Sequence, residues 1–192
     1  MSSWDKHLKY EEWVKKFENE IRRLKKEKEY ADFKNIKKPR TELHLAYNSI
    51  LLTQLMNGSR ISETIEALLK FAADKKHEHC QYTGAKKRRR NKKDRIIIIP
   101  NIVTSNFISY IKDRSVKQIQ NGVMLFAMNR WKINTHSLRY AFVSYQNRKG
   151  TPASVTAGIM RHTNVGMIEH YSRDEEADEI FKEMMKNGVN KK

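Results

Sequence analysis

The chain has 192 residues, 39% of them hydrophobic, which suits one globular domain with a short additional element. Its 39 Lys and Arg against 22 Asp and Glu give a formal net charge of +17, which favours a polyanionic partner, nucleic acid before an anionic membrane surface. The sequence contains neither an apolar run of about 18 residues nor an apolar N-terminal signal region, so we expect an intracellular, cytoplasmic protein without a membrane span.

Cys80 is the sole cysteine, which rules out an intramolecular disulfide and suits a reducing compartment. It follows His77 and His79 in the stretch HEHC, which has some likeness to a set of metal ligands. A fourth ligand at the spacing of zinc sites is missing. The sequence therefore predicts no metal site, and we expect no cofactor.

The first helix is expected from Trp4 to about Lys28, where apolar residues at spacings of three and four form one narrow stripe. Such a helix packs on its own domain in the commonest case, and the alternatives are dimerisation or the remainder of an N-terminal domain. Pro39 should break the pattern, and Thr41 should cap a second helix over 42–56 that is apolar on all sides, as a buried helix is.

A tight junction follows this buried helix. Gly58 is placed to end it, and a helical period resumes over 61–73 with Ser62 or Glu63 near its start. Arg60 is thereby predicted to lie between two helices.

The strongest strand signal is RIIIIP, residues 95–100, whose isoleucines favour a strand that Pro100 ends. With HCQYTGA, residues 79–85, it predicts a hairpin whose tip is the basic run KKRRRNKKD, residues 86–94. This run could be an ordinary solvated loop.

Helical segments dominate the second half of the chain. We expect residues 101–120 to be helical and Asn121-Gly122 to form a turn. A helix is expected over 135–150 with Thr135 as its cap and Gly150 as its stop, and another begins at the cap Thr151 with Pro152 first. A final amphipathic segment is expected over 175–188. The fold class is thus mainly α with a small antiparallel β-hairpin. Trp131, Tyr145, Met124, Met128 and Met160 are expected in the core.

One set of polar residues suggests chemistry. In HSLR, His136 and Arg139 are three residues apart and project from one helix face, a pattern that by itself is usually a chance surface pair. Arg60 in GSRISE, His162 in RHTN and Tyr171 nine residues later complete the set. In this order the residues resemble the tyrosine recombinase (phage integrase) family.

The resemblance runs from about Thr41 to Ser172 and implies the catalytic-domain fold of that family, with residues 1–40 as an N-terminal helix and linker and 41–192 as the catalytic domain. It implies that Arg60 and Arg139 bind the scissile phosphate and that His136 assists proton transfer. It also implies that His162 hydrogen-bonds the phosphate and that Tyr171 is the nucleophile.

These residue types suit phosphoryl transfer on physical grounds. Two guanidiniums can hold the equatorial oxygens of a five-coordinate phosphate with forked hydrogen bonds and remain protonated. A cationic site favours the tyrosine anion, whose attack stores the bond as a phosphotyrosine. With cations supplied by side chains, magnesium has no necessary role.

The family also uses a lysine on a β-hairpin as general acid. Counting back eight residues from Pro100 selects Lys92, whereas the end of the first strand selects Lys86 or Lys87, and Lys93 is adjacent. The rest of the hairpin tip is predicted to bind the DNA backbone, through Lys86, Lys87, Arg88, Arg89, Arg90 and Lys93.

The resemblance implies a site-specific recombinase, or integrase, that cleaves and rejoins double-stranded DNA at specific sites through a 3′-phosphotyrosyl intermediate. Four protomers would act together on DNA, with residues 174–188 docking on a neighbour. The lysine- and isoleucine-rich composition is compatible with an archaeal or viral source and hence with viral genome integration. The alternatives are DNA relaxation like that of a type IB topoisomerase, and a non-catalytic DNA-binding or architectural protein.

Overall fold

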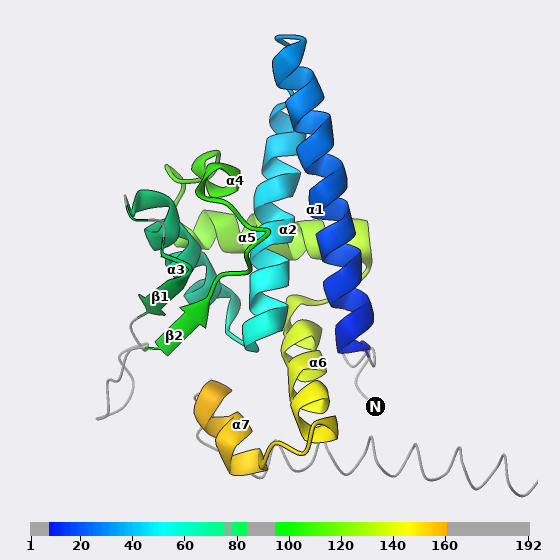
Figure 1. Cartoon of the computed structure of the whole chain (residues 1–192), viewed down its shortest axis with the longest axis vertical. Coiled ribbons are helices and arrows are strands. Elements are labelled where there is room, and N and C mark those ends of the chain that lie inside the picture. The colour runs from blue at the N-terminus through cyan, green and yellow to red at the C-terminus, as the bar shows by residue number, and fades with distance from the viewer. Residues whose placement is uncertain (1–7, 75, 77, 84–94, 161–192) are drawn as a thin grey trace, which may run out of the picture.

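A computed structural model describes residues 8–74, 76, 78–83 and 95–160 (Figure 1). In chain order its elements are α1 (Tyr10–Phe33), α2 (Pro39–Asn57), α3 (Ile61–Ala73), β1 (Cys80–Thr83), β2 (Arg95–Ile98), α4 (Ser105–Ser109), α5 (Val116–Phe126), the π-helix η1 (Ala127–Trp131), α6 (Thr135–Arg148) and α7 (Ala153–Met160). The described part of the chain is therefore mainly helical with a two-stranded antiparallel sheet, which confirms the expected fold class.

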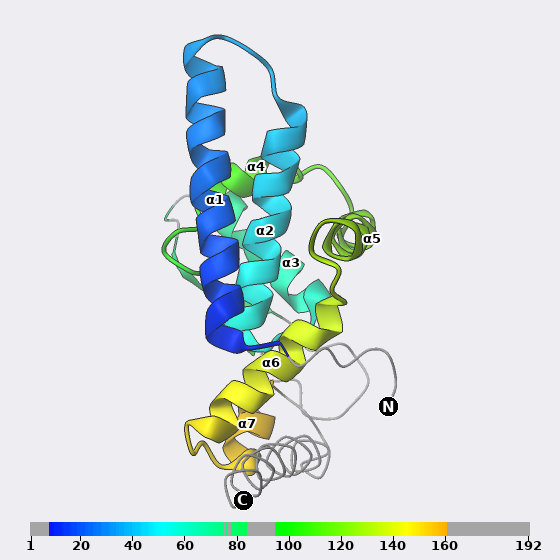
Figure 2. The ribbon, with the colours of Figure 1, turned by 90° about the vertical axis from the view of Figure 1, so that its right-hand side faces the viewer.

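Helices α1 and α2 form a long antiparallel pair around which the other elements gather (Figures 1 and 2). The apolar stripe of α1 is buried in the same core as the apolar residues of α2, with Phe17 and Ile21 fully buried. The prediction that the first helix packs on its own domain is confirmed. The helix ends at Phe33, five residues later than expected, and the chain then reverses near Asn35, whose φ is 55°.

Two expectations at the start of α2 are wrong. Pro39 opens the helix instead of interrupting the chain before it, because a proline at the first helical position loses no intrahelical hydrogen bond. Thr41 lies inside α2 and does not cap it. Its hydroxyl donates to Glu27 Oε1 at 3.0 Å and so links α2 to α1.

The region after the sheet also departs from expectation. Residues 101–120 are helical only in part, in the short α4 and in the start of α5, which begins at a capping box of Ser115 and Gln118. The turn predicted at Asn121-Gly122 is absent, since both residues lie inside α5. Gly122 packs against Tyr47 so closely that a Cβ there would meet the tyrosine hydroxyl. Glycine is therefore favoured at position 122 by close packing between helices and not by a turn.

The cap of helix α6 lies one residue earlier than predicted. Asn134 is the cap, since its side chain accepts from the backbone N–H of His136 at 2.8 Å, and Thr135 is the first helical residue. Gly150 follows the helix with a φ of 75°, as expected of a stop signal. Helix α7 begins at Ala153, so Pro152 is not its first residue as predicted, and the Thr151 hydroxyl donates to Gln146 Oε1 at 2.9 Å.

The predicted core aromatics and methionines divide into two groups. Trp131 packs against the core and Met160 is buried, as expected. Met124 and Met128 are 41% and 54% exposed, so their prediction as core residues is wrong. Tyr145 stacks on Tyr10 at the contact between α6 and α1.

Strands β1 and β2 pair antiparallel, with Cys80 opposite Ile98 and Thr83 opposite Arg95, which confirms the predicted hairpin. Alternate residues of the second strand are buried, among them Ile97. The amide of Asn57 fixes this strand to the end of α2, because it donates to Ile98 O at 2.8 Å and accepts from Ile98 N at 2.9 Å. The sheet edge is therefore tied to the turn that follows α2.

Candidate active site

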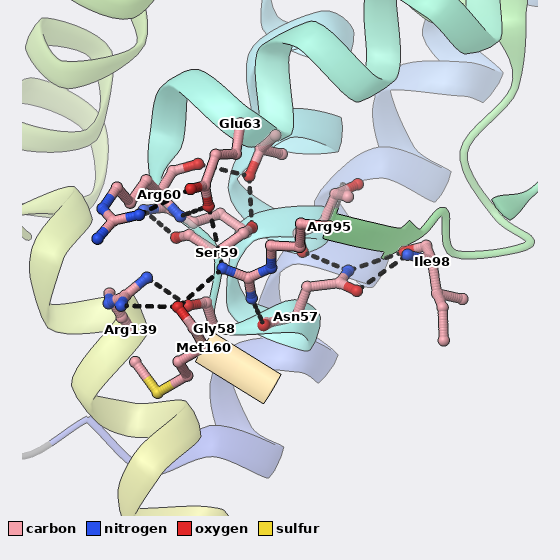
Figure 3. Close-up of polar contacts among 12 residues, drawn as sticks. Asn57, Gly58, Ser59, Arg60, Glu63, Arg95, Ile98, Arg139 and Met160 are labelled. Atoms are coloured by element: carbon pink, nitrogen blue, oxygen red, sulfur yellow. Dashed lines mark hydrogen bonds and ion pairs between the residues drawn. The ribbon is translucent and has the colours of Figure 1, made fainter. Parts of the chain in front are cut away.

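The turn between α2 and α3 is the centre of the site (Figure 3). Gly58 ends α2 in the left-handed conformation with a φ of 55°, and Arg60 is the N-cap residue of α3. The Arg60 side chain is half exposed, and its Nη1 lies 2.8 Å from Glu63 Oε1. This contact with Glu63 holds the Arg60 guanidinium at the surface.

Arg139 reaches the same turn from α6. Its Nη1 donates to Gly58 O at 2.9 Å and its Nη2 donates to Met160 O at 3.2 Å. Burial, and then the neighbouring charges of Arg60 and Arg95, lower the pKa of Arg139 to about 10. The structure therefore brings two of the predicted site residues, Arg60 and Arg139, from distant parts of the chain to one turn.

A third guanidinium, that of Arg95, completes the cluster from the start of β2, and only 4% of its surface is exposed. Its Nη1 lies 3.0 Å from Glu63 Oε2 and 3.3 Å from Met160 O, and its Nη2 lies 2.6 Å from Asn57 O. The sequence motifs do not point to this residue. Strand alternation was the available signal, because position 95 lies on the same face as the buried Ile97.

Glu63 joins the exposed and the buried arginine. One carboxylate oxygen accepts from Arg60 Nη1, and the other accepts from the Arg60 backbone N–H at 3.0 Å and from Arg95. Burial opposes ionisation of Glu63, but the backbone N–H of Arg60 and the charge of Arg95 outweigh it and lower the pKa. Three guanidiniums against this one carboxylate leave a formal excess of two positive charges, which suits an anion such as phosphate.

His136 lies on the first turn of α6, three residues before Arg139, and its side chain is exposed. Its ring packs edge-on against Tyr140, with the two ring centroids 4.6 Å apart. The contact with the following turn orients the ring on the outer side of α6.

The remaining predicted site residues lie outside the described residues. These are His162, Tyr171, the candidate general acid Lys92 and the DNA-binding group Lys86, Lys87, Arg88, Arg89, Arg90 and Lys93. The arginine cluster nevertheless adjoins both segments in the chain. Arg95 follows Lys92 by three residues, and Met160 precedes His162 by two.

The described residues contain neither a cluster of metal ligands nor a membrane-spanning helix. No group of three His, Cys, Asp or Glu side chains gathers there as a metal ion would need, and His77 of the HEHC stretch lies outside them. No helix in the same ranges has the length and apolar character to cross a membrane.

Comparison with known proteins identifies three relatives. The chain is 32% identical over 205 residues to an uncharacterized protein of Methanocaldococcus jannaschii, which covers 94% of this chain and 88% of that protein. It is 34% identical over 143 residues to a protein of Acidianus two-tailed virus named "Putative integrase", covering 72% of this chain and 56% of the viral protein. It is 32% identical over 157 residues to a protein of the Sputnik virophage with the same description, covering 70% of each chain.

No family model matches the chain. No solved structure matches it either.

Proposed function

The chain belongs to the tyrosine recombinase (phage integrase) family, and from this premise we propose that it cleaves and rejoins DNA strands through a covalent 3′-phosphotyrosyl intermediate. The single observation that carries the proposal is the meeting of Arg60 and Arg139 at the turn after α2. Arg60 is half exposed, whereas Arg139 is buried at the same turn and donates to two carbonyls, so a phosphate bound by both arginines would replace one of these carbonyls at Arg139.

The two arginines bind the non-bridging oxygens of the scissile phosphate. Arg60 offers an exposed guanidinium whose position is set by Glu63. Arg139 remains cationic near neutral pH, because its lowered pKa of about 10 is still well above 7. Charge that develops on the phosphate oxygens in the transition state is thereby stabilised by groups that are already oriented.

The Tyr171 oxygen attacks phosphorus, forms the phosphotyrosyl bond and breaks the bond from phosphorus to the 5′ oxygen. The leaving oxygen takes a proton from a lysine of the 86–93 run, with Lys92 the first candidate. His162 donates a hydrogen bond to the phosphate, and His136 assists transfer of the proton that the Tyr171 hydroxyl loses. Attack of a free 5′ hydroxyl on the phosphotyrosine reverses these steps and rejoins a strand.

The partner in this proposal is double-stranded DNA that carries specific recombination sites, on which four protomers assemble. The alternative within the same chemistry is relaxation by a monomer. Supercoiled DNA without paired sites distinguishes the two, because a relaxing enzyme removes supercoils from it, whereas a recombinase requires two sites to exchange strands.

A nicked duplex that loses a short strand after cleavage tests the covalent step, since the lost 5′ end prevents rejoining. We expect the native chain to form a covalent protein–DNA adduct on a denaturing gel and the Tyr171→Phe variant to form none. Tyr30→Phe is the matched control, because this tyrosine is 60% exposed at the far end of α1 and should leave adduct formation unchanged. Absence of an adduct with the native chain, or an undiminished adduct with Tyr171→Phe, would contradict the mechanism.

The general acid is identified by a second substrate, in which sulfur replaces the leaving 5′ oxygen. A thiolate leaves without a proton, so the defect caused by loss of the true general acid should disappear with this substrate. Single replacements of Lys86, Lys87, Lys92 and Lys93 by Ala are compared on both substrates. If the sulfur substrate instead restores cleavage by a variant of another lysine, that lysine and not Lys92 is the general acid.

A further inference from the structure

We propose that Arg95 is a positioning residue that keeps hold of α7 at Met160 when Arg139 exchanges the Met160 carbonyl for a DNA phosphate. The proposal rests on the proposed function for its phosphate. It concerns a residue that does not itself touch the DNA.

The Met160 carbonyl is shared between two buried guanidiniums (Figure 3). Arg139 Nη2 donates to it at 3.2 Å and Arg95 Nη1 donates to it at 3.3 Å. Met160 lies in α7, and its carbonyl oxygen accepts from both guanidiniums. This carbonyl therefore stands where the two cations would otherwise draw an anionic oxygen.

The two arginines are held by bonds of different strength. Besides Met160, Arg139 donates in its described bonds only to another neutral carbonyl, that of Gly58. Arg95 donates at 2.6 Å to Asn57 O and at 3.0 Å to the ionised Glu63 carboxylate. A hydrogen bond to an ionised carboxylate is stronger than one to a neutral carbonyl. An arriving phosphate oxygen consequently replaces Met160 O at Arg139, while Arg95 stays in place.

The stronger bonds of Arg95 matter because the segment that follows Met160 carries two proposed catalytic residues. His162 follows Met160 by two residues and Tyr171 follows it by eleven, so the point at which Met160 is held sets where this segment begins. Arg95 also lies directly after the lysine-rich run. A single guanidinium thus fixes Met160 and the start of β2, the described residues next to both of these segments, relative to the turn that carries Arg60.

Arg95→Lys is the principal test variant, because it keeps a cation beside Glu63 and yet cannot span Asn57 O, Glu63 and Met160 O at once. We expect adduct formation on the nicked duplex to slow by about 10- to 100-fold, the size of effect that a misplaced reacting group produces. The dissociation constant for uncleaved duplex should change by less than about 3-fold, because the residue acts on positions and not on phosphate contacts.

A methylphosphonate at the scissile position separates positioning from phosphate binding. It removes one charged oxygen, so it should lessen the defect of a variant that has lost a phosphate-binding guanidinium, such as Arg60→Ala, and should leave the defect of Arg95→Lys unchanged. Equal rescue of both variants, or cleavage by Arg95→Lys at the native rate, would overturn the proposal. So would a rise in the dissociation constant that accounts for the whole effect.

Amide hydrogen exchange gives a readout that does not require activity. Arg95→Lys should speed amide exchange over residues 157–160 of α7 by about 10-fold or more, because release of Met160 O makes local opening of this part of the helix easier. Arg60→Ala should leave exchange at these residues unchanged, because its described contacts are with Glu63. An unaltered exchange rate in Arg95→Lys would overturn the positional role. Failure of the native chain to form an adduct would instead overturn the proposed function alone.

Discussion

Single residues decide the geometry of the turn that carries the site. Gly58 has a φ of 55°, and a Cβ at this position would enter the ring of Phe142. Both the left-handed backbone and the close approach of α6 therefore require glycine. The same turn supplies carbonyls to Arg139 and Arg95, so its conformation sets the positions of both guanidiniums.

Gly58→Ala should accordingly lower the free energy of unfolding by about 2–4 kcal/mol, the sum of a strained backbone and an overpacked contact. Gly158→Ala is the matched control, because this glycine lies inside α7 and a Cβ there would meet nothing within 4 Å. There alanine should raise the free energy of unfolding by about 0.5–1 kcal/mol. Urea denaturation measures both, and equal effects would contradict the account of Gly58.

At the scale of elements, the contact between the first and sixth helices depends on aromatic packing. Tyr10 of α1 stacks on Tyr145 of α6 with ring centroids 4.1 Å apart, and it meets Phe142 edge-on at 6.4 Å. Burial, and then the negative potential of Tyr145 and Glu11, raises the pKa of Tyr10 to about 12. The neutral phenol is therefore the form that the folded protein stabilises.

This pKa predicts a loss of stability in alkali. The contribution is fully present below about pH 10, where the tyrosine is neutral in both the folded and unfolded states, and it is lost as the pH rises through about 12. Replacement of Tyr10 by Phe should remove this part of the decline in the free energy of unfolding, measured by urea denaturation in steps above pH 9. Replacement of the exposed Tyr30 by Phe should leave the decline as it is, and an identical curve for both variants would refute the assignment.

The burial of α1 predicts that this helix is required for a stable fold. Phe17 is fully buried between Trp13 and Trp131, so Phe17→Ala should cost about 3–5 kcal/mol of unfolding free energy. Phe33, at the end of the same helix, is 82% exposed, and Phe33→Ala should change the value by less than about 0.5 kcal/mol. Thermal denaturation of the two variants compares them directly, and similar melting temperatures would show that α1 does not stabilise the fold.

At the scale of the whole molecule, the charge of +17 governs how the proposed DNA complex responds to salt. Each phosphate contact made by a cation adds about 0.9 to the slope of log affinity against log salt concentration. Replacing Arg88, Arg89 and Arg90 together by Gln should lower the slope by about one for each contact that is lost. Fluorescence anisotropy with labelled duplex at several salt concentrations gives the slope.

Lys34 and Lys37 supply the control for this measurement. They lie in and beside the connection between α1 and α2, at the opposite end of the molecule from α7 (Figure 1). Their replacement by Gln removes surface charge far from the arginine cluster and should change the slope by less than the triple variant does. A slope unaltered by loss of the three arginines would show that they do not contact the DNA backbone.

The local pattern of the sequence determined the helices, the hairpin and the family. Periods of three to four residues mark helices and alternation marks strands, because both follow from the backbone hydrogen bonding of a few neighbouring residues. The order of Arg60, HSLR, His162 and Tyr171 indicated the family for a related reason, since the required chemistry restricts residue type at each position.

Only the tertiary structure decided which charged and small residues are buried, and against what. Gly122 reads locally as a turn residue and is in fact a packing site for Tyr47. Arg95 opens the predicted strand directly after the basic run, and the local pattern does not show that it is buried against Glu63, Asn57 O and Met160 O. These environments arise from contacts between segments far apart in the chain, where burial of a charge depends on partners that no local pattern specifies.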